Sequence, residues 1–378
     1  MARSALGVLF SLFFGAFIAP AAIAIEAPAA IVAQTPAPQN AVVKNKPAAS
    51  KRHSVAKKKR GKKRGVNASF DSREKLVKKV VMVGGKRKVI YQRVAYRPYI
   101  PAVPPVISAG DLAGLRLTRD PLALKSNAAL VMDQASSEIL FEKNAQVALP
   151  IASITKLMTS LIVVEANQDM DELLTITAED VDKEKNSHSR LRVGSQLTRA
   201  NMLHIALMSS ENRAASALGR HYPGGLPAFV DAMNAKATEL GMTNTHYVDS
   251  TGLSKKNVAS ARDLAKLVVA SHQHPVIRQY STDSKYVVDP GGPVLQYRNS
   301  NRLVALPGWE IGLQKTGYIS EAGRCLVMQA NIEGRPVIMV FLDSKGTRSR
   351  LADASRIRKW LQATKPSATL HAVNALQS

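Results

Sequence analysis

The chain has 378 residues, 46% of them hydrophobic, with a formal net charge of +24 and a single cysteine. One cysteine excludes an internal disulfide framework, so the fold must depend on an ordinary hydrophobic core. Residues 40–100 alone carry a net charge of +18, so the basic character belongs mostly to one segment.

The first residues have the pattern of a secretory signal peptide. Arg3 precedes an apolar run that ends at Ile18, and Ala22 and Ala24 form a small-x-small cleavage pattern. The run is shorter than the roughly 20 residues that a membrane-spanning helix needs. We therefore expect residues 1–24 to be removed and the protein to act in the periplasm without a stable membrane anchor. An uncleaved N-terminal anchor is the alternative.

Residues 25–111 are predicted to be a basic, largely disordered linker, because like charges repel and little apolar area is available for burial. Within it, valines and isoleucines alternate with basic residues over 76–94, which indicates a hairpin that turns at Gly84 and Gly85. An exported protein rarely meets nucleic acid. Anionic envelope polymers, phosphorylated lipids or the wall itself are therefore the expected partners of this basic region, and no nucleic acid is expected.

Residues 112–362 have a globular composition and are predicted to form the catalytic domain, with a short C-terminal tail at 363–378. Strand patterns at both ends of this region enclose a helical middle, which predicts a mixed α/β fold whose sheet joins the two ends of the domain. The expected strands are 128–133, 138–142, 311–315, 325–332 and 337–342, and the expected helices are 153–164, 198–208, 211–220, 227–240, 260–272 and 349–361.

The pattern Ser-x-x-Lys occurs three times in the chain, at Ser54, Ser72 and Ser153. The first two lie in the basic segment, whereas Ser153 begins an apolar helix on which Lys156 shares its face. A serine hydroxyl needs a base, and a lysine at its reference pKa of about 10.4 is charged at neutral pH. Burial and a second cation would lower that pKa, and Lys315 is a candidate for the cation.

Two further patterns occur once each in this order: Ser210-Glu211-Asn212 and Lys315-Thr316-Gly317. The set of three resembles the motifs of penicillin-binding proteins and serine β-lactamases. Segments 149–159, 241–245, 251–253 and 260–264 are similar to the low-molecular-mass DD-peptidases. Within that family, segments 208–215, 222–225 and 325–328 are most similar to the D-alanyl-D-alanine endopeptidases. Gln314 departs from the family pattern, in which a threonine commonly precedes the Lys-Thr-Gly.

The resemblance implies a penicillin-binding-protein fold with an antiparallel sheet flanked by helices and a mainly helical second part. It also implies catalytic roles. Ser153 would attack the D-alanyl carbonyl and Lys156 would accept its proton. Ser210 would relay a proton to the leaving amine, and Asn212 would orient Lys156 and the substrate amide.

The same resemblance implies a binding role for the third motif. Lys315 and Thr316 would receive a substrate carboxylate, and Lys315 would lower the pKa of Lys156. Gly317 would keep side-chain bulk away from the strand along which substrate lies. The backbone N–H groups of Ser153 and Tyr318 would form the oxyanion hole. No metal and no cofactor is expected.

We therefore expect a serine DD-peptidase that acts on peptidoglycan stem peptides and cross-links, preferentially as an endopeptidase, and that β-lactams inhibit. The alternatives are a D-alanyl-D-alanine carboxypeptidase, a serine β-lactamase and a non-enzymatic penicillin-binding sensor. Other reactive side chains are interpreted as structural: Cys325 as a buried strand thiol, and His204, His221, His246 and Asp249 as packing, surface or loop residues.

Overall fold

The computed structural model describes residues 74–95 and 106–364. The predicted signal peptide, most of the linker and the C-terminal tail beyond 364 lie outside these residues. The described part comprises two units, a hairpin and a larger α/β unit, each of which is treated by itself.

The hairpin consists of β1 (Glu74–Val83) and β2 (Lys86–Ala95), which pair antiparallel with Val83 opposite Lys86. The turn residues Gly84 and Gly85 have φ of 59° and 76°. A two-residue hairpin loop whose strands keep their right-handed twist needs positive φ at both positions, which glycine adopts without strain. The alternating segment therefore forms a hairpin with the turn at the expected glycines.

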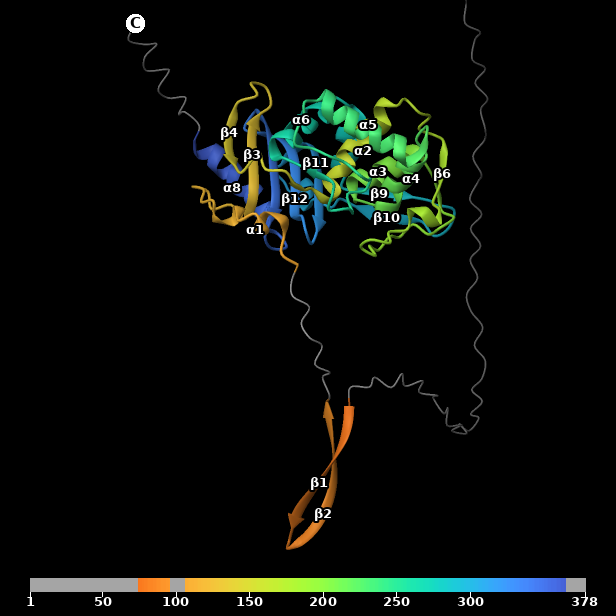
Figure 1. The fold of residues 1–378 in the computed structure, drawn as a ribbon, viewed down its shortest axis with the longest axis vertical. Coiled ribbons are helices and arrows are strands. Elements are labelled where there is room, and N and C mark those ends of the chain that lie inside the picture. Colours follow the sequence, from red (N-terminus) through yellow and green to blue (C-terminus); the bar gives the residue numbers. More distant parts are fainter. Residues whose placement is uncertain (1–73, 96–105, 365–378) are drawn as a thin grey trace, which may run out of the picture. The chain divides into compact units, whose positions relative to one another are not determined.

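The larger unit is built on a five-stranded antiparallel sheet (Figure 1). Its spatial order is β11 (Glu310–Ile319), β12 (Gly323–Ile332), β13 (Arg335–Ser344), β3 (Ser126–Asp133) and β4 (Ile139–Lys143). β3, from the start of this unit, thus pairs with β13, from its end, which confirms the predicted sheet that joins the two ends of the domain.

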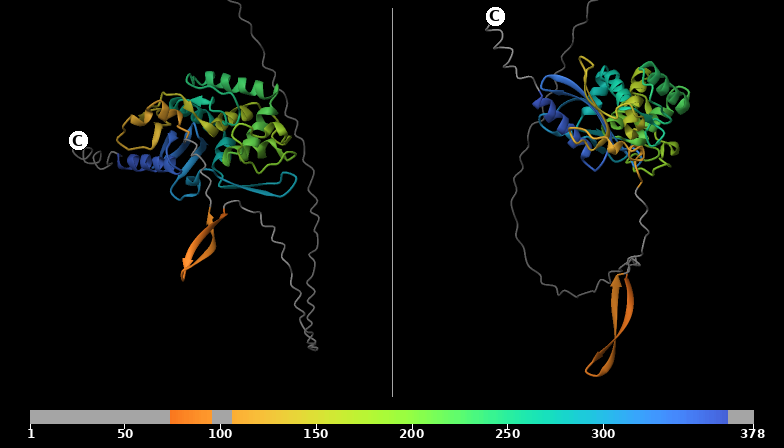
Figure 2. Two further views of the ribbon diagram at one scale, coloured as in Figure 1. Left: turned by 60° about the horizontal axis from the view of Figure 1, so that its bottom comes forward. Right: turned by 60° about the vertical axis from the view of Figure 1, so that its left-hand side comes forward.

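Both faces of the sheet are covered. On β13, Val337, Met339 and Phe341 pack with α8 (Ser349–Ala363) in one core, whereas Ile338 and Val340 belong to the larger core on the opposite face. A strand buried on both faces shows a continuous apolar run instead of alternation, which is the pattern of residues 337–342. Figure 2 shows α8 on one side of the sheet and the helical part on the other.

The helical part surrounds α2 (Thr155–Glu165), whose residues from Thr155 to Val163 are all buried. A helix that is enclosed on every side explains why its sequence has no polar face. The other helices are α1 (Ala109–Leu112), α3 (Arg199–Met208), α4 (Asn212–Arg220), α5 (Gly225–Glu239), α6 (Ala261–His272) and α7 (Pro275–Thr282). The predicted mixed α/β class is confirmed.

Several short elements were not predicted. Besides α7, they are the pairs β9 (Lys285–Val288) with β10 (Leu295–Arg298), β6 (Leu173–Thr175) with β7 (Gln196–Thr198), and β5 (Leu149–Pro150) with β8 (Val258–Ala259). Strands this short have too few residues for a hydrophobic period to be recognised.

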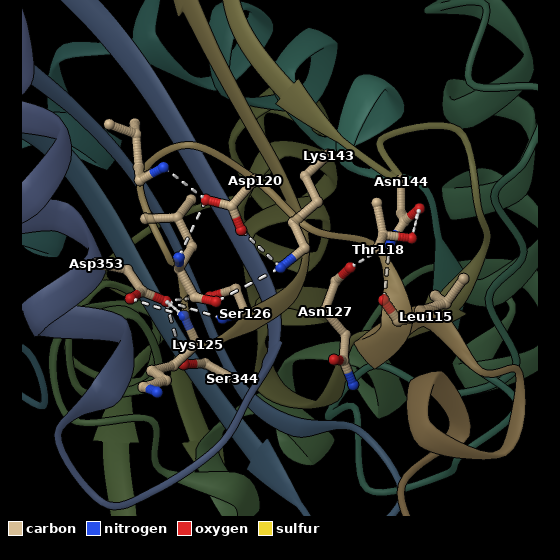
Figure 3. Close-up of polar contacts among 12 residues, drawn as sticks. Leu115, Thr118, Asp120, Lys125, Ser126, Asn127, Lys143, Asn144, Ser344 and Asp353 are labelled. Carbon is tan, nitrogen blue, oxygen red and sulfur yellow. Dashed lines mark hydrogen bonds and ion pairs between the residues drawn. The ribbon is translucent and has the colours of Figure 1, made fainter.

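Polar contacts hold the start of β3 to the C-terminal helix (Figure 3). The Asp353 carboxylate on α8 accepts hydrogen bonds from the backbone N–H of Lys125 and Ser126 and from the Ser126 hydroxyl, at 2.7 to 3.1 Å. Nearby, Lys143 on β4 forms a 2.9 Å ion pair with Asp120. Because Asp353 is fully buried, these bonds fix where α8 crosses the sheet.

Residues before the expected domain boundary at 112 also pack on the sheet. The Asp343 carboxylate on β13 accepts hydrogen bonds from the Ser108 hydroxyl at 2.7 Å and from the Gly110 N–H at 3.0 Å.

Within the described ranges, no helix is both long and apolar enough to cross a membrane.

Candidate active site

Ser153 and Lys156 lie at the start of the buried helix α2. Ser153 is in a 3₁₀ turn, η2 (Ala152–Ile154), and α2 itself begins at Thr155, slightly later than predicted. Ser153 is partly exposed, whereas Lys156 is completely buried. The Lys156 Nζ lies 3.1 Å from the Ser153 Oγ, so the two side chains meet as their spacing predicted.

Lys156 Nζ has two further oxygen neighbours, Asn212 Oδ1 at 2.7 Å and the Thr251 carbonyl at 2.6 Å. Burial lowers the pKa of Lys156 to about 8, although the carboxylates of Asp249 and Glu211 act in the opposite direction. A neutral amine has two N–H donors and one lone pair. The two short contacts use the donors, which leaves the lone pair directed at the Ser153 hydroxyl.

Ser210 and Asn212 come from the connection between α3 and α4. Ser210 has φ of 66°, which is unusual for a residue other than glycine, and Asn212 is the first residue of α4. Glu211 is the N-cap of α4 and its side chain accepts a hydrogen bond from the Arg213 N–H. Among the described residues, no hydrogen bond joins the Ser210 hydroxyl to Ser153 or Lys156, so only Asn212 of this motif is in direct contact with the lysine.

The loop before α3 holds the Asn212 amide. Asn212 Nδ2 donates to the Ser187 Oγ at 2.8 Å, and this bond fixes which end of the amide faces Lys156. Ser187 is itself held, because its N–H donates to the Asp182 carboxylate at 2.7 Å. Lys185 in the same loop pairs with Glu321 at 2.7 Å. The sequence analysis did not identify Ser187, since a serine in a polar loop carries no periodic signal.

The third motif lies on β11, with Lys315 and Thr316 both buried. Burial lowers the pKa of Lys315 well below its usual value, and the positive charges of Lys156 and Arg350 lower it further. Lys315 Nζ donates to the Thr316 carbonyl at 3.0 Å, and the Thr316 hydroxyl donates to the Ser300 Oγ at 2.8 Å. Two buried lysines therefore share one region in which both cannot easily be charged.

Arg350 is a further cation that the sequence analysis missed. Its side chain reaches from α8 to β11 and β12, where Nη1 donates to the Gly317 carbonyl at 2.7 Å and to the Cys325 carbonyl at 3.2 Å. Burial lowers the pKa of Arg350 to about 10. It stabilises the strand segment that follows Lys315.

Gly317 allows a close approach between two backbone segments. A Cβ at this position would lie 2.8 Å from the Ile151 carbonyl oxygen and 3.1 Å from the Ser153 nitrogen. The glycine therefore lets β11 approach the backbone of η2, and this brings the N–H of Ser153 close to the strand. The side chain of the neighbouring Tyr318 is 54% exposed, and the Arg324 guanidinium lies 4.4 Å from the centre of its ring.

Gln314 lies on β11 two residues before Thr316, and its side chain is held by contacts with α7 and with the segment before Ser300. It is fully buried, and its Nε2 donates to the Ser281 carbonyl at 2.7 Å and to Asn299 Oδ1 at 2.9 Å. The glutamine thus holds β11 against α7.

The remaining reactive side chains have structural environments. Cys325 is a buried thiol on β12, and burial raises its pKa to about 12, as the structural interpretation predicted. His204 is buried and stacks on Tyr280 at 4.2 Å. Asp249 accepts the N–H groups of Thr251 and Gly252, both at 2.6 Å. It thereby orients the loop whose carbonyl faces Lys156.

A groove of about 670 Å³ borders the site. Asn212 and Thr251 line it together with residues of the 179–184 and 248–256 segments. Within 74–95 and 106–364, no group of three or more histidine, cysteine, aspartate or glutamate side chains could hold a metal ion. The arrangement itself, a serine beside a buried lysine with a depressed pKa, is suited to nucleophilic attack on a carbonyl.

Comparisons with known proteins agree with this chemistry. A family model described as D-alanyl-D-alanine carboxypeptidase matches residues 116–346. A D-alanyl-D-alanine endopeptidase of Pseudomonas aeruginosa is 47% identical over 265 residues, which are 70% of this chain and 84% of that protein. One from Escherichia coli is 44% identical over 244 residues, 64% of this chain and 79% of that protein.

Solved structures give the same result for the fold. The Streptomyces K15 DD-transpeptidase matches with a TM-score of 0.60 and 27% identity, over 65% of this chain and all of that one. Penicillin-binding protein D2 from Listeria monocytogenes matches with a TM-score of 0.56 and 28% identity, over 64% of this chain and 98% of that one. The fold expected from the three motifs is confirmed.

Proposed function

Because the chain belongs to the D-alanyl-D-alanine carboxypeptidase family, we propose that it is a serine DD-peptidase of peptidoglycan whose main reaction is the hydrolysis of D-alanyl cross-links. The single observation that carries the chemistry is the contact between the partly exposed Ser153 hydroxyl and the buried Lys156 amine, whose pKa is lowered to about 8.

In the proposed acylation, the Ser153 Oγ forms a bond with the D-alanyl carbonyl carbon and its proton passes to Lys156 Nζ. The N–H groups of Ser153 and Tyr318 stabilise the negative oxygen. When the tetrahedral intermediate collapses, the C–N bond breaks and the leaving amine takes, through Ser210, the proton that Lys156 had accepted, so Lys156 is neutral again. Water then attacks the ester carbonyl carbon and gives a proton to Lys156. The C–O bond to Ser153 breaks, Lys156 returns the proton to the Ser153 Oγ, and the stem leaves with a free D-alanyl carboxylate.

Asn212 and Lys315 support this sequence without bonding to the reacting carbon. Asn212 Oδ1 accepts one N–H of Lys156, which keeps the lone pair of the amine directed at Ser153. Lys315 provides positive potential where a substrate carboxylate would lie, and Thr316 provides a hydroxyl beside it. Between the two buried lysines, the charge of Lys156 lowers the pKa of Lys315, whereas burial is what lowers the pKa of Lys156.

Two observations favour cross-links over uncross-linked stems. The relatives with 47% and 44% identity are D-alanyl-D-alanine endopeptidases. Asn212, which contacts the catalytic lysine, also lines the groove of about 670 Å³, and we assign this groove to the second stem peptide of a cross-link.

The deciding experiment is to incubate the purified protein with cross-linked muropeptide dimers and with monomeric pentapeptides, and to separate the products by chromatography. We expect dimers to be converted to monomers faster than D-alanine is released. Release of D-alanine with dimers left intact would replace the endopeptidase assignment with a carboxypeptidase one. Hydrolysis of neither substrate would contradict the DD-peptidase assignment altogether.

Labelling tests the nucleophile separately. A fluorescent penicillin should acylate the protein at one residue, Ser153, because a β-lactam mimics the D-alanyl-D-alanine end and leaves a slowly hydrolysed ester. Ser153→Ala should abolish labelling, and Ser160→Ala on the same helix should not. Labelling that persists in Ser153→Ala would exclude the assigned nucleophile.

We also propose that the protein is exported to the periplasm, and that its basic N-terminal region increases contact with anionic envelope material. The signal-like pattern of residues 1–24 and the net charge of +18 over residues 40–100 support this. If so, residues 1–24 should be absent from the protein recovered from the cell envelope, which N-terminal sequencing would detect.

A further inference from the structure

The hairpin β1–β2 has an unusual distribution of side chains. From Val77 to Gln92 it carries five cations and no acidic residue. Its apolar side chains are exposed as well, with Val80 at 55%, Met82 at 64% and Tyr91 at 67%. A two-stranded hairpin with so little burial is only marginally stable alone in water, so the surface requires a partner.

The register places both basic and apolar side chains on each face of the hairpin. On one face, Val80 pairs with Val89, and the neighbouring pairs put Lys78 opposite Tyr91 and Met82 opposite Arg87. The other face contains Val77, Lys79, Val81, Val83, Lys86, Lys88 and Ile90. Neither face is apolar enough to join a protein core without burying cations, which would be costly.

We propose that this hairpin is a membrane-surface anchor that lies in the headgroup region of an anionic lipid bilayer. Such a surface supplies both negative charge and an apolar environment for the side chains of the hairpin. Anionic headgroups attract Lys78, Lys79 and the run from Lys86 to Lys88, and the adjacent acyl boundary accepts the apolar side chains. Lysine and arginine can keep their charged ends in the headgroups while their stems lie deeper.

The tip is the part best suited to insertion. Met82 and Val83 precede the glycine turn and are 64% and 59% exposed, and Lys86 follows directly. The two glycines add no polar side chain to this end. A soluble polyanion would satisfy the cations but would leave these apolar side chains in water, which favours a lipid surface over a polymer.

The test uses the whole chain and vesicles of phosphatidylglycerol and phosphatidylethanolamine in a flotation assay. A triple variant, Val80→Thr, Met82→Thr and Val83→Thr, keeps every charge and retains strand propensity. We expect it to bind these vesicles at least about tenfold more weakly than the unchanged chain. The matched control changes three valines of the larger unit that are also more than half exposed, Val193, Val287 and Val294, to threonine and should bind normally.

A second measurement follows the tip itself. The only native cysteine is buried, so a fluorophore on Met82→Cys reports the hairpin, and one on Val294→Cys serves as its control. The Met82 label should shift to the blue with anionic vesicles and not with polyphosphate. Equal vesicle binding by the threonine variant, or an unshifted Met82 label on bound vesicles, would overturn the proposal in favour of a contact through charge alone.

Catalysis on a small soluble substrate should be the same in all these variants. The experiments therefore test the two proposals separately. A result that contradicts the peptidase activity leaves the membrane contact untouched, and a result that contradicts the membrane contact leaves the peptidase activity untouched.

Discussion

The protonation of Lys156 makes a quantitative prediction for the rate of acylation. With a pKa of about 8, roughly one molecule in ten has a neutral Lys156 at pH 7. At the ordinary value of 10.5 the fraction would be about one in 3,000, so burial increases the competent form by a factor of about 300. Below the lowered pKa the amine is charged and cannot accept the Ser153 proton.

The perturbation is pH, and the assay is the stopped-flow rate at which a chromogenic β-lactam acylates the protein between pH 5.5 and 9.5. We expect the rate to rise about tenfold per pH unit on the acid side and to level off above about 8.5. Between pH 6 and pH 9 the neutral fraction, and hence the rate, should increase by about 90-fold. Because Lys156 and Lys315 are close, the midpoint of the pH–rate profile reports the titration of the two lysines together and not of Lys156 alone.

A variant tests the electrostatic cause. Because the carboxylate of Glu211 raises the pKa of Lys156, Glu211→Gln should move the midpoint to lower pH. The control is Glu179→Gln, whose side chain is 79% exposed and which should leave the midpoint in place. A rate that climbs without a plateau to pH 10, or a midpoint that rises in Glu211→Gln, would refute this account of the base.

Three other substitutions have definite expected outcomes. Lys156→Arg keeps the charge but cannot deprotonate, so penicillin acylation at pH 7 should fall by orders of magnitude, and near-normal acylation would exclude the base role. Ser187→Ala leaves the Asn212 N–H without its acceptor and should slow acylation about tenfold. Ser187→Thr keeps a hydroxyl at this position and should restore the rate. Ser189→Ala in the same loop should not change the rate. Gly252→Ala would place a Cβ 2.0 Å from the Ala152 carbonyl oxygen, so urea denaturation should show a loss of more than about 2 kcal/mol. Gly334→Ala, with similar φ and open space around it, should lose only about 1 kcal/mol.

The sequence was most informative where a residue acts through its own chemistry or through a regular period. The strands at 325–332 and 337–342 follow from long apolar runs, and the meeting of Ser153 with Lys156 follows from helical spacing. These signals are local, because each is determined by no more than about eight consecutive residues.

The parts that escaped prediction depend on contacts between distant segments. Ser187 lies 25 residues from Asn212 in sequence, and Arg350 reaches a strand 33 residues away. Nothing in the neighbouring residues of either side chain indicates its partner. The close approach of η2 to Gly317 was not predicted for the same reason, since it is visible only in three dimensions.

The position of β3 between β4 and β13 has a consequence for how the molecule assembles. The first hairpin of the sheet, residues 126–143, leaves the ribosome long before its neighbour at 335–344, so one edge of β3 stays unpaired until nearly the whole chain exists. Lys315 is likewise synthesised more than 150 residues after Ser153. Such late, long-range pairing makes folding slow. A truncated or still-emerging chain therefore has a serine but no reactive centre, and hydrolysis begins only when the last strands are in place.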